Sequence, residues 1–234
     1  MGILKKIIKR IIIIIDKIGQ KDILVLGDSH AQVFTFPLFK LYFPFIRFSV
    51  CSIGGATASG LENPNSKTQA YNKFENKLNK KKWDYIIILL GEVDTGFVIW
   101  YRAEKYKVPV TKMFLQAIDR YTNFIKKAKQ YGSVIVISTP LPTITDDNDW
   151  GEVANLRKEV KAKQKDKTEL TIKFNKNIEK YCLFNNIFYI NLDKDSMGEN
   201  GLVKKTLLDN NKLDHHYNKV AYTKLISSKL KKLL

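Results

Sequence analysis

The stretch Ile23-Leu24-Val25-Leu26-Gly27-Asp28-Ser29-His30 begins with four consecutive apolar residues and ends in small and polar ones. A short apolar run followed directly by glycine is typical of a β-strand that is buried on both faces of a sheet. The polar residues then lie at the carboxyl end of the strand, where open α/β sheets bind their ligands. The stretch therefore predicts a buried strand that delivers Ser29 to a functional site.

Apolar runs and helical periods alternate along the rest of the chain. Further strands are expected at residues 45–51, 85–90, 134–137 and 187–190, and helices at residues 68–82, 110–131, 168–184 and 217–233. This alternation is typical of an α/β domain in which helices cover both faces of a mostly parallel sheet. The charged segment 146–167 has no clear period, so we expect it to be an insertion or lid near the carboxyl edge of the sheet.

The composition fits one domain of ordinary size with a strongly basic surface. The chain has 234 residues, 44% of them hydrophobic, and a net charge of +17. Such a charge favours anionic partners, which include membrane surfaces, acidic sugar polymers and phosphorylated cofactors. No nucleic-acid-binding motif is recognisable, so specific nucleic-acid binding is not expected. The two cysteines follow no metal-ligand spacing, and no metal site is expected.

Residues 1–19 are expected to form a basic amphipathic helix separate from the domain at residues 20–234. Isoleucines gather on one half of its helical wheel, and lysines and an arginine on the other. The unbroken apolar run, residues 11–15, is too short to cross a bilayer, and no signal-peptide cleavage site follows it. The apolar face suits either an anionic membrane or packing on protein. We therefore expect a cytoplasmic protein, peripheral on the inner membrane face if the first alternative holds.

A serine nucleophile needs a base within hydrogen-bond reach and a carboxylate that orients the base. The chain has three histidines, and two of them, His215 and His216, follow Asp214 directly near the C-terminus. The Ser29 N–H, at the expected start of a helix, and the glycine pair Gly54-Gly55 after the second strand offer backbone donors for a developing oxyanion. These residues predict a Ser-His-Asp acyl-transfer site.

Four sequence blocks together resemble those of the SGNH (GDSL-type) hydrolases. They are Gly27-Asp28-Ser29, Gly55-Ala56-Thr57, the segment Gly91–Asp94, and the segment Asp214–Asn218, and they follow the expected elements in the family's order. The resemblance implies a flavodoxin-like three-layer fold, with Ser29 as nucleophile and His216 as base. It also implies oxyanion donors at Gly55 and at the Ser29 N–H, and hydrolysis without a cofactor.

The third block departs from the family pattern of Gly-x-Asn-Asp. Val93 occupies the position of the asparagine whose side chain completes the oxyanion hole, so it can donate only through its backbone. Removing one such donor costs on the order of 10²–10³ in rate. Glu92, Asp94 or Arg102 are candidates for reshaping the oxyanion and substrate-binding site. The two carboxylates equally suit a structural role, bonded to loop N–H groups.

The last block departs from the family pattern of Asp-x-x-His. Leu213 stands three residues before His216, so the candidate carboxylate is Asp214, two residues before it. Asp209 is a weaker candidate for the carboxylate. His215 remains an alternative for the base.

The function expected from these observations is serine-dependent acyl transfer on an O-acylated carbohydrate or its precursor. Water as acceptor would make the protein an esterase, and a sugar hydroxyl would make it an O-acetyltransferase of a surface polysaccharide, with acetyl-CoA as a possible donor. One alternative is a non-catalytic, membrane-associated binding protein on the same fold. Another is a metal-dependent phosphoesterase, because Asp28-x-His30 has the ligand spacing of such enzymes.

Overall fold

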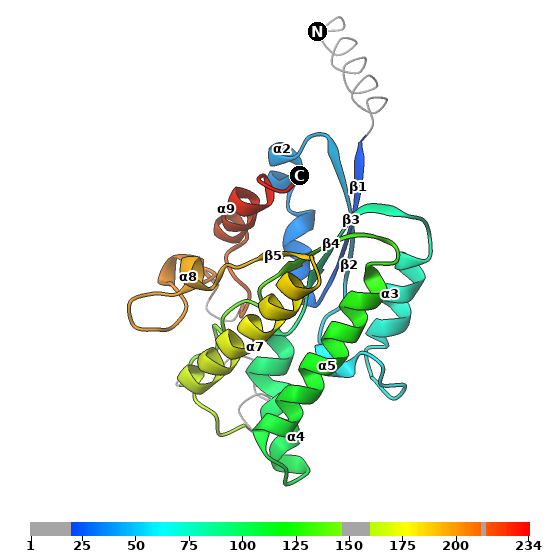
Figure 1. The fold of residues 1–234 in the computed structure, drawn as a ribbon. Coiled ribbons are helices and arrows are strands. Elements are labelled where there is room, and N and C mark those ends of the chain that lie inside the picture. Colours follow the sequence, from blue (N-terminus) through cyan, green and yellow to red (C-terminus); the bar gives the residue numbers. More distant parts are fainter. Residues whose placement is uncertain (1–19, 147–159, 212–213) are drawn as a thin grey trace, which may run out of the picture.

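A computed structural model describes residues 20–146, 160–211 and 214–234 of the chain. Its centre is a five-stranded sheet in the order β2-β1-β3-β4-β5, and every neighbouring pair is parallel (Figure 1). The strands are β1 (Lys21–Gly27), β2 (Ile46–Ser52), β3 (Trp83–Leu89), β4 (Gly132–Ile137) and β5 (Phe188–Ile190). The predicted α/β fold with a parallel sheet is confirmed.

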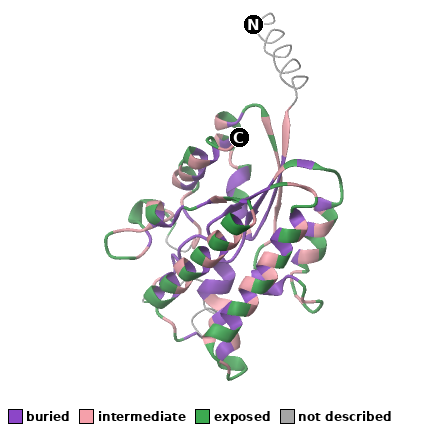
Figure 2. Cartoon of the chain, viewed as in Figure 1, coloured by how far each residue is buried: buried purple, intermediate pink, exposed green. Residues whose placement is uncertain are grey.

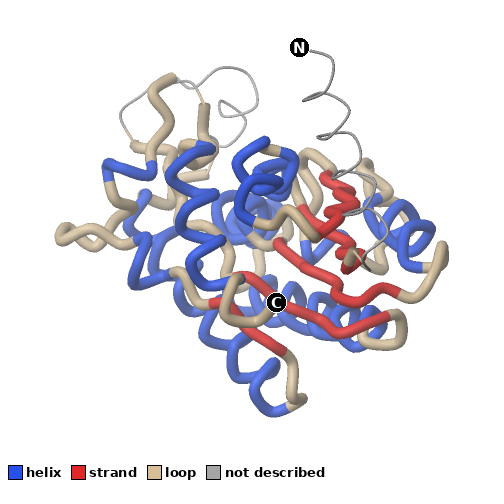
Figure 3. Tube along the Cα trace, turned by 90° about the horizontal axis from the view of Figure 1, so that it is seen from above, coloured by secondary structure: helices blue, strands red, loops and turns tan. Residues whose placement is uncertain are grey.

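Helices pack on both faces of this sheet, because alternate strand residues point to opposite sides. Leu24 and Ile86 belong to one apolar core, which includes residues of α3 (Ala70–Leu78), α5 (Val110–Ala128) and α7 (Gln164–Phe184). Their strand neighbours Ile23 and Ile87 belong to a second core on the other face. That core includes residues of α2 (Pro37–Tyr42) and α9 (Lys219–Leu230). Figure 2 shows buried residues in the central strands and along the helices that pack on them, and Figure 3 shows the strands lying between helices.

Short helices that the sequence analysis did not predict fill the connections. They are η1 (Ser29–Thr35), η2 (Ala58–Gly60), the π-helical turn η3 (Asp94–Val98), α4 (Ile99–Lys105), α8 (Asp193–Ser196) and η4 (Lys205–Leu207). The last long helix begins at Lys219 rather than at Tyr217, because the Asn218 side chain caps it by accepting from the N–H of Ala221 at 3.1 Å.

The predicted insertion or lid at residues 146–167 is wrong at its carboxyl end. Gln164 starts helix α7, and its buried side chain donates to the carbonyl of Pro142 at 3.0 Å, which ties this end of the segment to the domain. Residues 147–159 lie outside the described residues, as does the amphipathic helix expected at residues 1–19. Among the helices of the described ranges, none is long and apolar enough to span a membrane.

The close approach of β1 to β3 explains the glycine at position 27. A Cβ atom on Gly27 would lie 2.4 Å from the carbonyl oxygen of Leu89 and 2.7 Å from the Cβ of Ala31. On the other side of β1, the Gly27 carbonyl accepts from the N–H of Ile53 at 2.9 Å. The residue before Asp28 is thus held between β3 and the end of β2, and this fixes where the next residues begin.

Candidate active site

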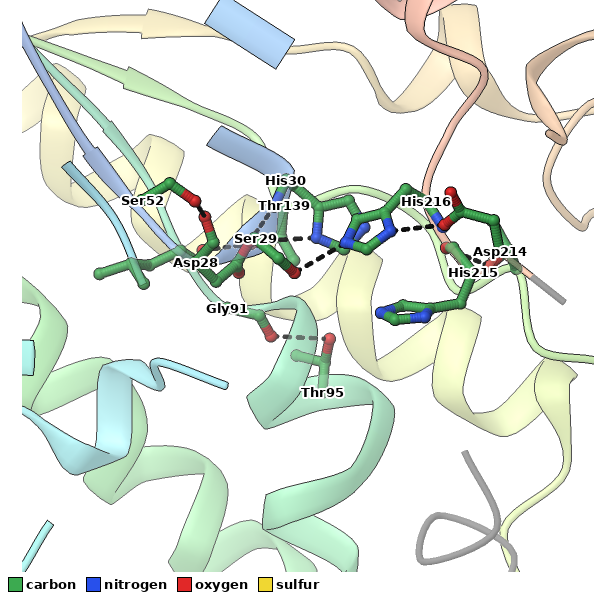
Figure 4. A network of polar contacts seen from close by, with 12 residues as sticks. Asp28, Ser29, His30, Ser52, Gly91, Thr95, Thr139, Asp214, His215 and His216 are labelled. Atoms are coloured by element: carbon green, nitrogen blue, oxygen red, sulfur yellow. Dashed lines mark hydrogen bonds and ion pairs between the residues drawn. The ribbon is translucent and has the colours of Figure 1, made fainter. Parts of the chain in front are cut away.

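Three side chains form a hydrogen-bonded chain at the carboxyl edge of the sheet (Figure 4). The Nε2 atom of His216 lies 2.8 Å from Oγ of Ser29, and its Nδ1 atom lies 2.6 Å from Oδ1 of Asp214. With the Nδ1 proton directed at Asp214, Nε2 is left as the acceptor for the Ser29 hydroxyl. Residues 187 positions apart in the chain are therefore in the order that a nucleophile, a base and an orienting carboxylate require.

The hydrogen bonds of Asp28, the residue before Ser29, fix the position of Ser29. The buried Asp28 caps η1 by accepting from the N–H of His30 at 2.9 Å, and its own carbonyl accepts from the Ser52 hydroxyl at 2.7 Å. Ser29 is the first residue of η1, so its N–H has no acceptor within the helix. No acceptor elsewhere in the described ranges takes it either. The Ser29 N–H is therefore available to a bound group.

The segment that carries the base is anchored on both sides. Thr143 donates its hydroxyl proton to the carbonyl of His215 at 2.5 Å, and the hydroxyl of Tyr217 accepts from the N–H of Leu141 at 2.8 Å. The segment 141–143, after β4, therefore positions the histidine. These contacts could not be predicted from the sequence, because nothing in the residue pattern marks Thr143 or Tyr217 as support for a site.

Asp214, which stands two residues before His216 rather than three, is held by a tight turn. Oδ1 of Asp214 accepts both from the His216 ring and from the His216 backbone N–H, the latter at 2.9 Å. Partial burial by itself would raise the pKa of Asp214, but the hydrogen bonds from His216 and the nearby imidazoles outweigh it and lower the pKa below its usual value. Asp214 therefore stays ionised at neutral pH beside the ring that it orients. Asp209 instead accepts from the N–H of Asn211, within its own loop.

The glycine turn after β2 presents a second backbone donor. The N–H of Ala56 donates to the carbonyl of Ile53 at 3.0 Å, which closes a turn with Gly54 and Gly55 at its centre. Gly55 has φ 71°, the left-handed value that the third residue of a type II turn requires. Its N–H finds no acceptor in the described part of the chain. Two backbone N–H groups, of Ser29 and Gly55, are thus open at this edge.

The third block contributes no side-chain donor at the position of the family asparagine. Val93 is 7% exposed and stands at the start of the η3 turn. Two residues before it in the chain, Gly91 has φ 121° and is packed so closely that a Cβ would lie 2.5 Å from Oγ1 of Thr139. Glu92 is buried as well. At the position of the family asparagine this block therefore carries only an aliphatic side chain.

For Asp94 the structure favours the structural role over contact with a substrate. The side chain is fully buried and accepts from the N–H groups of Ala58 and Ser59 at 2.6 and 2.9 Å. Complete burial raises the pKa of Asp94 to about 6, against the opposing effect of these hydrogen bonds. Arg102 donates to the Ser59 hydroxyl at 3.0 Å. Both residues thus brace the η2 loop that follows the glycine turn.

The other two histidines surround His216. The ring of His215 lies 4.2 Å from that of His216 between centroids, and the ring of His30 lies 4.7 Å from it. Nδ1 of His30 faces Oδ1 of the buried Asp28 at 3.0 Å. Asp28 and His30 are therefore paired with each other beneath the site.

A metal ion would compete with the Ser-His-Asp arrangement. Within the described ranges, the one group that could hold an ion is Asp214 with His215 and His216, whose ligand atoms lie within 4.8 Å of one another. An ion held by these residues would take one ring nitrogen of His216, and both ring nitrogens are already used in the contacts with Asp214 and Ser29. The geometry therefore suits the triad or a metal at this place, but not both.

A buried polar network below the site predicts a dependence of stability on pH. The Asn175 side chain donates to the carbonyl of Thr139 at 3.0 Å and to Oδ1 of Asp193 at 2.7 Å. Burial raises the pKa of Asp193 from 3.8 to about 6. The folded state therefore holds this proton between about pH 4 and pH 6, where the unfolded chain has lost it, so stability falls as pH rises through that window.

The expected size of this effect is about 3 kcal/mol at most, because one unit of pKa corresponds to about 1.4 kcal/mol. Asp193→Asn keeps an oxygen acceptor for Asn175 but removes the titration. The measurement is urea unfolding of both proteins between pH 4 and pH 7. As the pH rises, the free energy of unfolding of the wild type should fall by more than that of Asp193→Asn. Parallel pH profiles of the two proteins would contradict this assignment.

The sequence model of the GDSL-like lipase/acylhydrolase family matches residues 40–228. The chain belongs to this family. No curated protein matches it. The fold expected from the SGNH blocks is therefore confirmed together with the family, which is a family of hydrolases that generally need no cofactor.

Solved structures with the same fold include several esterases of low sequence identity. An acetyl xylan esterase is 16% identical, with a TM-score of 0.57 over 91% of this chain and 99% of that chain. A GDSL-like lipase from Bacteroides thetaiotaomicron is 19% identical, with a TM-score of 0.56 over 97% of this chain and 98% of that chain. An aryl esterase from M. smegmatis is 14% identical, with a TM-score of 0.59 over 92% of this chain and 100% of that chain. At these identities the likeness shows the fold.

Proposed function

We propose that this GDSL-family protein transfers acyl groups through a covalent intermediate on Ser29, with His216 as general base and Asp214 as its orienting partner. The observation that carries the proposal is the 2.8 Å contact between Nε2 of His216 and Oγ of Ser29. A base at this distance can take the hydroxyl proton as Oγ attacks an ester carbonyl. Asp214 keeps the ring in the tautomer that leaves Nε2 free to do so.

The steps follow from this geometry. Attack by Oγ forms a bond to the carbonyl carbon, and the resulting oxyanion accepts from the N–H groups of Ser29 and Gly55. His216, now protonated, gives its proton to the leaving alkoxide, and an acyl-enzyme ester remains on Ser29. Water or a sugar hydroxyl then attacks this ester as His216 takes its proton, and return of that proton to Oγ restores the enzyme.

We propose an O-acylated carbohydrate, or its precursor, as the substrate. The acetyl xylan esterase of the same fold acts on an acetylated sugar polymer, as its name states, and this supports a carbohydrate ester here. With a sugar hydroxyl as acceptor the same acyl-enzyme would make an O-acetyltransferase, and acetyl-CoA would then be the donor. The basic segment 1–19 is proposed to hold the protein on the anionic inner face of a membrane, near lipid-linked glycan precursors.

The test of the proposed function is turnover of three substrate sets by the full chain. These are 4-nitrophenyl acetate, O-acetylated oligosaccharides in water, and acetyl-CoA with unacetylated oligosaccharides. Release of acetate from the oligosaccharides supports an esterase, and acetylated product from acetyl-CoA supports a transferase. If only 4-nitrophenyl acetate is turned over, the carbohydrate assignment is wrong. If none is turned over by folded protein, the non-catalytic alternative takes its place.

Asp214→Asn is expected to lower kcat by on the order of 10⁴, because the neutral amide stabilises neither the correct tautomer nor the imidazolium. Asp209→Asn is the matched control, since Asp209 lies in the same connection but accepts only from Asn211 N–H. That variant should stay within a few-fold of wild type on 4-nitrophenyl acetate. Equal losses in the two variants would show that Asp214 is not the orienting carboxylate.

Removal of divalent metal separates the acyl-transfer proposal from a phosphoesterase. Exhaustive chelation is expected to leave kcat/KM for 4-nitrophenyl acetate unchanged, because each step described above uses only protein groups. The comparison is made against protein with added Zn²⁺, which should inhibit by competing for Asp214 and His216. Loss of activity on chelation and its return with metal would favour the phosphoesterase.

A further inference from the structure

A wide groove lies along the open edge of the sheet, next to the candidate active site. Its volume is about 900 Å³, and it is formed by the end of β2, the glycine turn after it, and helix α3. The residues that line it are Val50, Cys51, Ser52, Ile53, Gly54, Lys67, Thr68, Lys73, Asn76, Lys77 and Lys80. Because β2 is an edge strand, no further strand of the described sheet closes this side.

The groove is strongly and uniformly basic. Four lysines line it and no carboxylate does. Within the described ranges, none of these four ammonium groups takes part in an ion pair or a hydrogen bond. By contrast, Lys81 and Lys127 close by are paired with Asp22 and Glu75. The groove therefore holds positive charge that the fold itself does not neutralise.

Three of these lysines lie on helix α3 or directly after its end, two of them on one stripe of the helix. Lys73 and Lys77 are four residues apart and lie above one another on the helix, which ends at Leu78, and Lys80 stands in the turn that follows. At 1.5 Å per residue Lys73 and Lys77 lie about 6 Å apart along the helix axis, and Lys80 continues the row beyond the end of the helix, so the groove can meet more than one charged unit of a polymer.

One end of the groove is connected to the residue that precedes Ser29. Ser52, which lines it, donates its hydroxyl proton to the carbonyl of Asp28 at 2.7 Å, and Gly54 precedes the open N–H of Gly55. Ser52 is also the register partner of Gly27 across neighbouring strands, a separation of about 4.8 Å. A chain lying in the groove could thus place one of its ester groups at Ser29 while its next units stay among the lysines.

We propose that this groove binds an anionic glycan, an acyl-bearing sugar polymer with carboxylate or phosphate groups, and presents its esters to Ser29. The inference rests on the proposed function and narrows its substrate class. The lysines attract the polymer and orient it along the groove, and its acyl ester binds and reacts at the triad. Clefts lined by one sign of charge raise association rates by 10–10³ and lose this advantage in salt.

The first experiment compares substrates of different charge on the full chain. The probes are O-acetylated oligogalacturonide as the carboxylate source, O-acetylated glycerol-phosphate oligomer as the phosphate source, O-acetylated xylo-oligosaccharide as the neutral sugar, and 4-nitrophenyl acetate. At low salt kcat/KM should be at least about tenfold higher on one or both anionic oligomers than on the neutral one. The better of the two identifies the anionic group. Equal or better turnover of the neutral sugar would overturn the proposal.

The second experiment removes the charge from the groove. The variant Lys73→Gln/Lys77→Gln/Lys80→Gln should lose about 10–100-fold in kcat/KM on the anionic oligomer, with little change on 4-nitrophenyl acetate and a flatter dependence on salt. Arginine at the same three positions should restore the anionic preference. The matched control replaces Lys173, Lys176 and Lys180, three exposed lysines of helix α7 at the other end of the sheet. Equal losses in the groove variant and the α7 variant would overturn the proposal.

A binding measurement separates this inference from the proposed function. Unacetylated oligogalacturonide and glycerol-phosphate oligomer should bind Ser29→Ala protein, and the groove substitutions should weaken that binding. If the groove substitutions weaken binding but no ester is turned over, the proposed function is wrong and the assignment of the groove as a glycan-binding site is supported. If esters are turned over but the groove substitutions do not change binding, the proposed function is supported and the assignment of the groove as a glycan-binding site is wrong. Tighter binding of a single-stranded oligonucleotide or an anionic vesicle than of either glycan would also overturn it.

Discussion

Ser29→Ala is expected to lower kcat for ester hydrolysis by on the order of 10⁴–10⁶, the largest effect of any single substitution in this chain. The size follows from the mechanism, because without Oγ no acyl-enzyme forms and His216 has no proton to take. Only the backbone donors of Ser29 and Gly55 remain to stabilise a direct attack by water. The measurement is the rate on 4-nitrophenyl acetate, with folding checked by circular dichroism.

A fluorophosphonate probe gives an independent readout of the same residue. Wild type should carry the adduct on Ser29, and Ser29→Ala should carry none. Ser49→Ala, which removes a hydroxyl from the interior of β2, is the matched control and should label and turn over substrate like wild type. Absence of the adduct in folded wild-type protein would favour a non-catalytic member of the family.

His216→Gln is expected to lower kcat by a similar factor, since serine and base act as a unit and the loss of either removes nearly the whole effect. The adjacent His215 provides the comparison, because its ring packs on that of His216. His215→Gln should therefore reduce kcat less than about tenfold. The pair of variants decides which of two neighbouring histidines is the base.

The double variant Ser29→Ala/His216→Gln sharpens this test. If the two residues cooperate in one proton transfer, the double variant should be no slower than either single one. Additive losses, or a larger loss in His215→Gln than in His216→Gln, would mean that the hydrogen bond between His216 and Ser29 is not the one used in the reaction.

The sheet and the members of the candidate triad could be predicted because they depend on local patterns. Buried parallel strands are continuous apolar runs, and the long helices have a clear period, so their positions follow from residue type alone. Asp214 could be named as a candidate, but its spacing from His216 left the choice open. The structure supplies the reason, since the His216 N–H and ring both bond to one carboxylate oxygen across a single residue.

Other parts of the site could not be predicted because they depend on contacts between distant segments. Asp94 accepts from the N–H groups of Ala58 and Ser59, which are 36 and 35 residues away in the chain, and no local pattern distinguishes this role from substrate binding. The short helices η1 and η3 span too few residues to show a period. The basic groove likewise joins one face of α3 to the end of β2, and only the packing brings them together.

The tight packing at Gly27 has a consequence for how such an enzyme can change. With no room for a Cβ between β1 and the carbonyl of Leu89, the nucleophile is built onto the middle of the sheet, the most buried part of the domain. The glycine turn and the lysines of α3 lie outside this frame, where substitutions cost little stability. Substitutions in the groove can therefore change which polymer is bound during evolution, while the position and orientation of Ser29 stay the same.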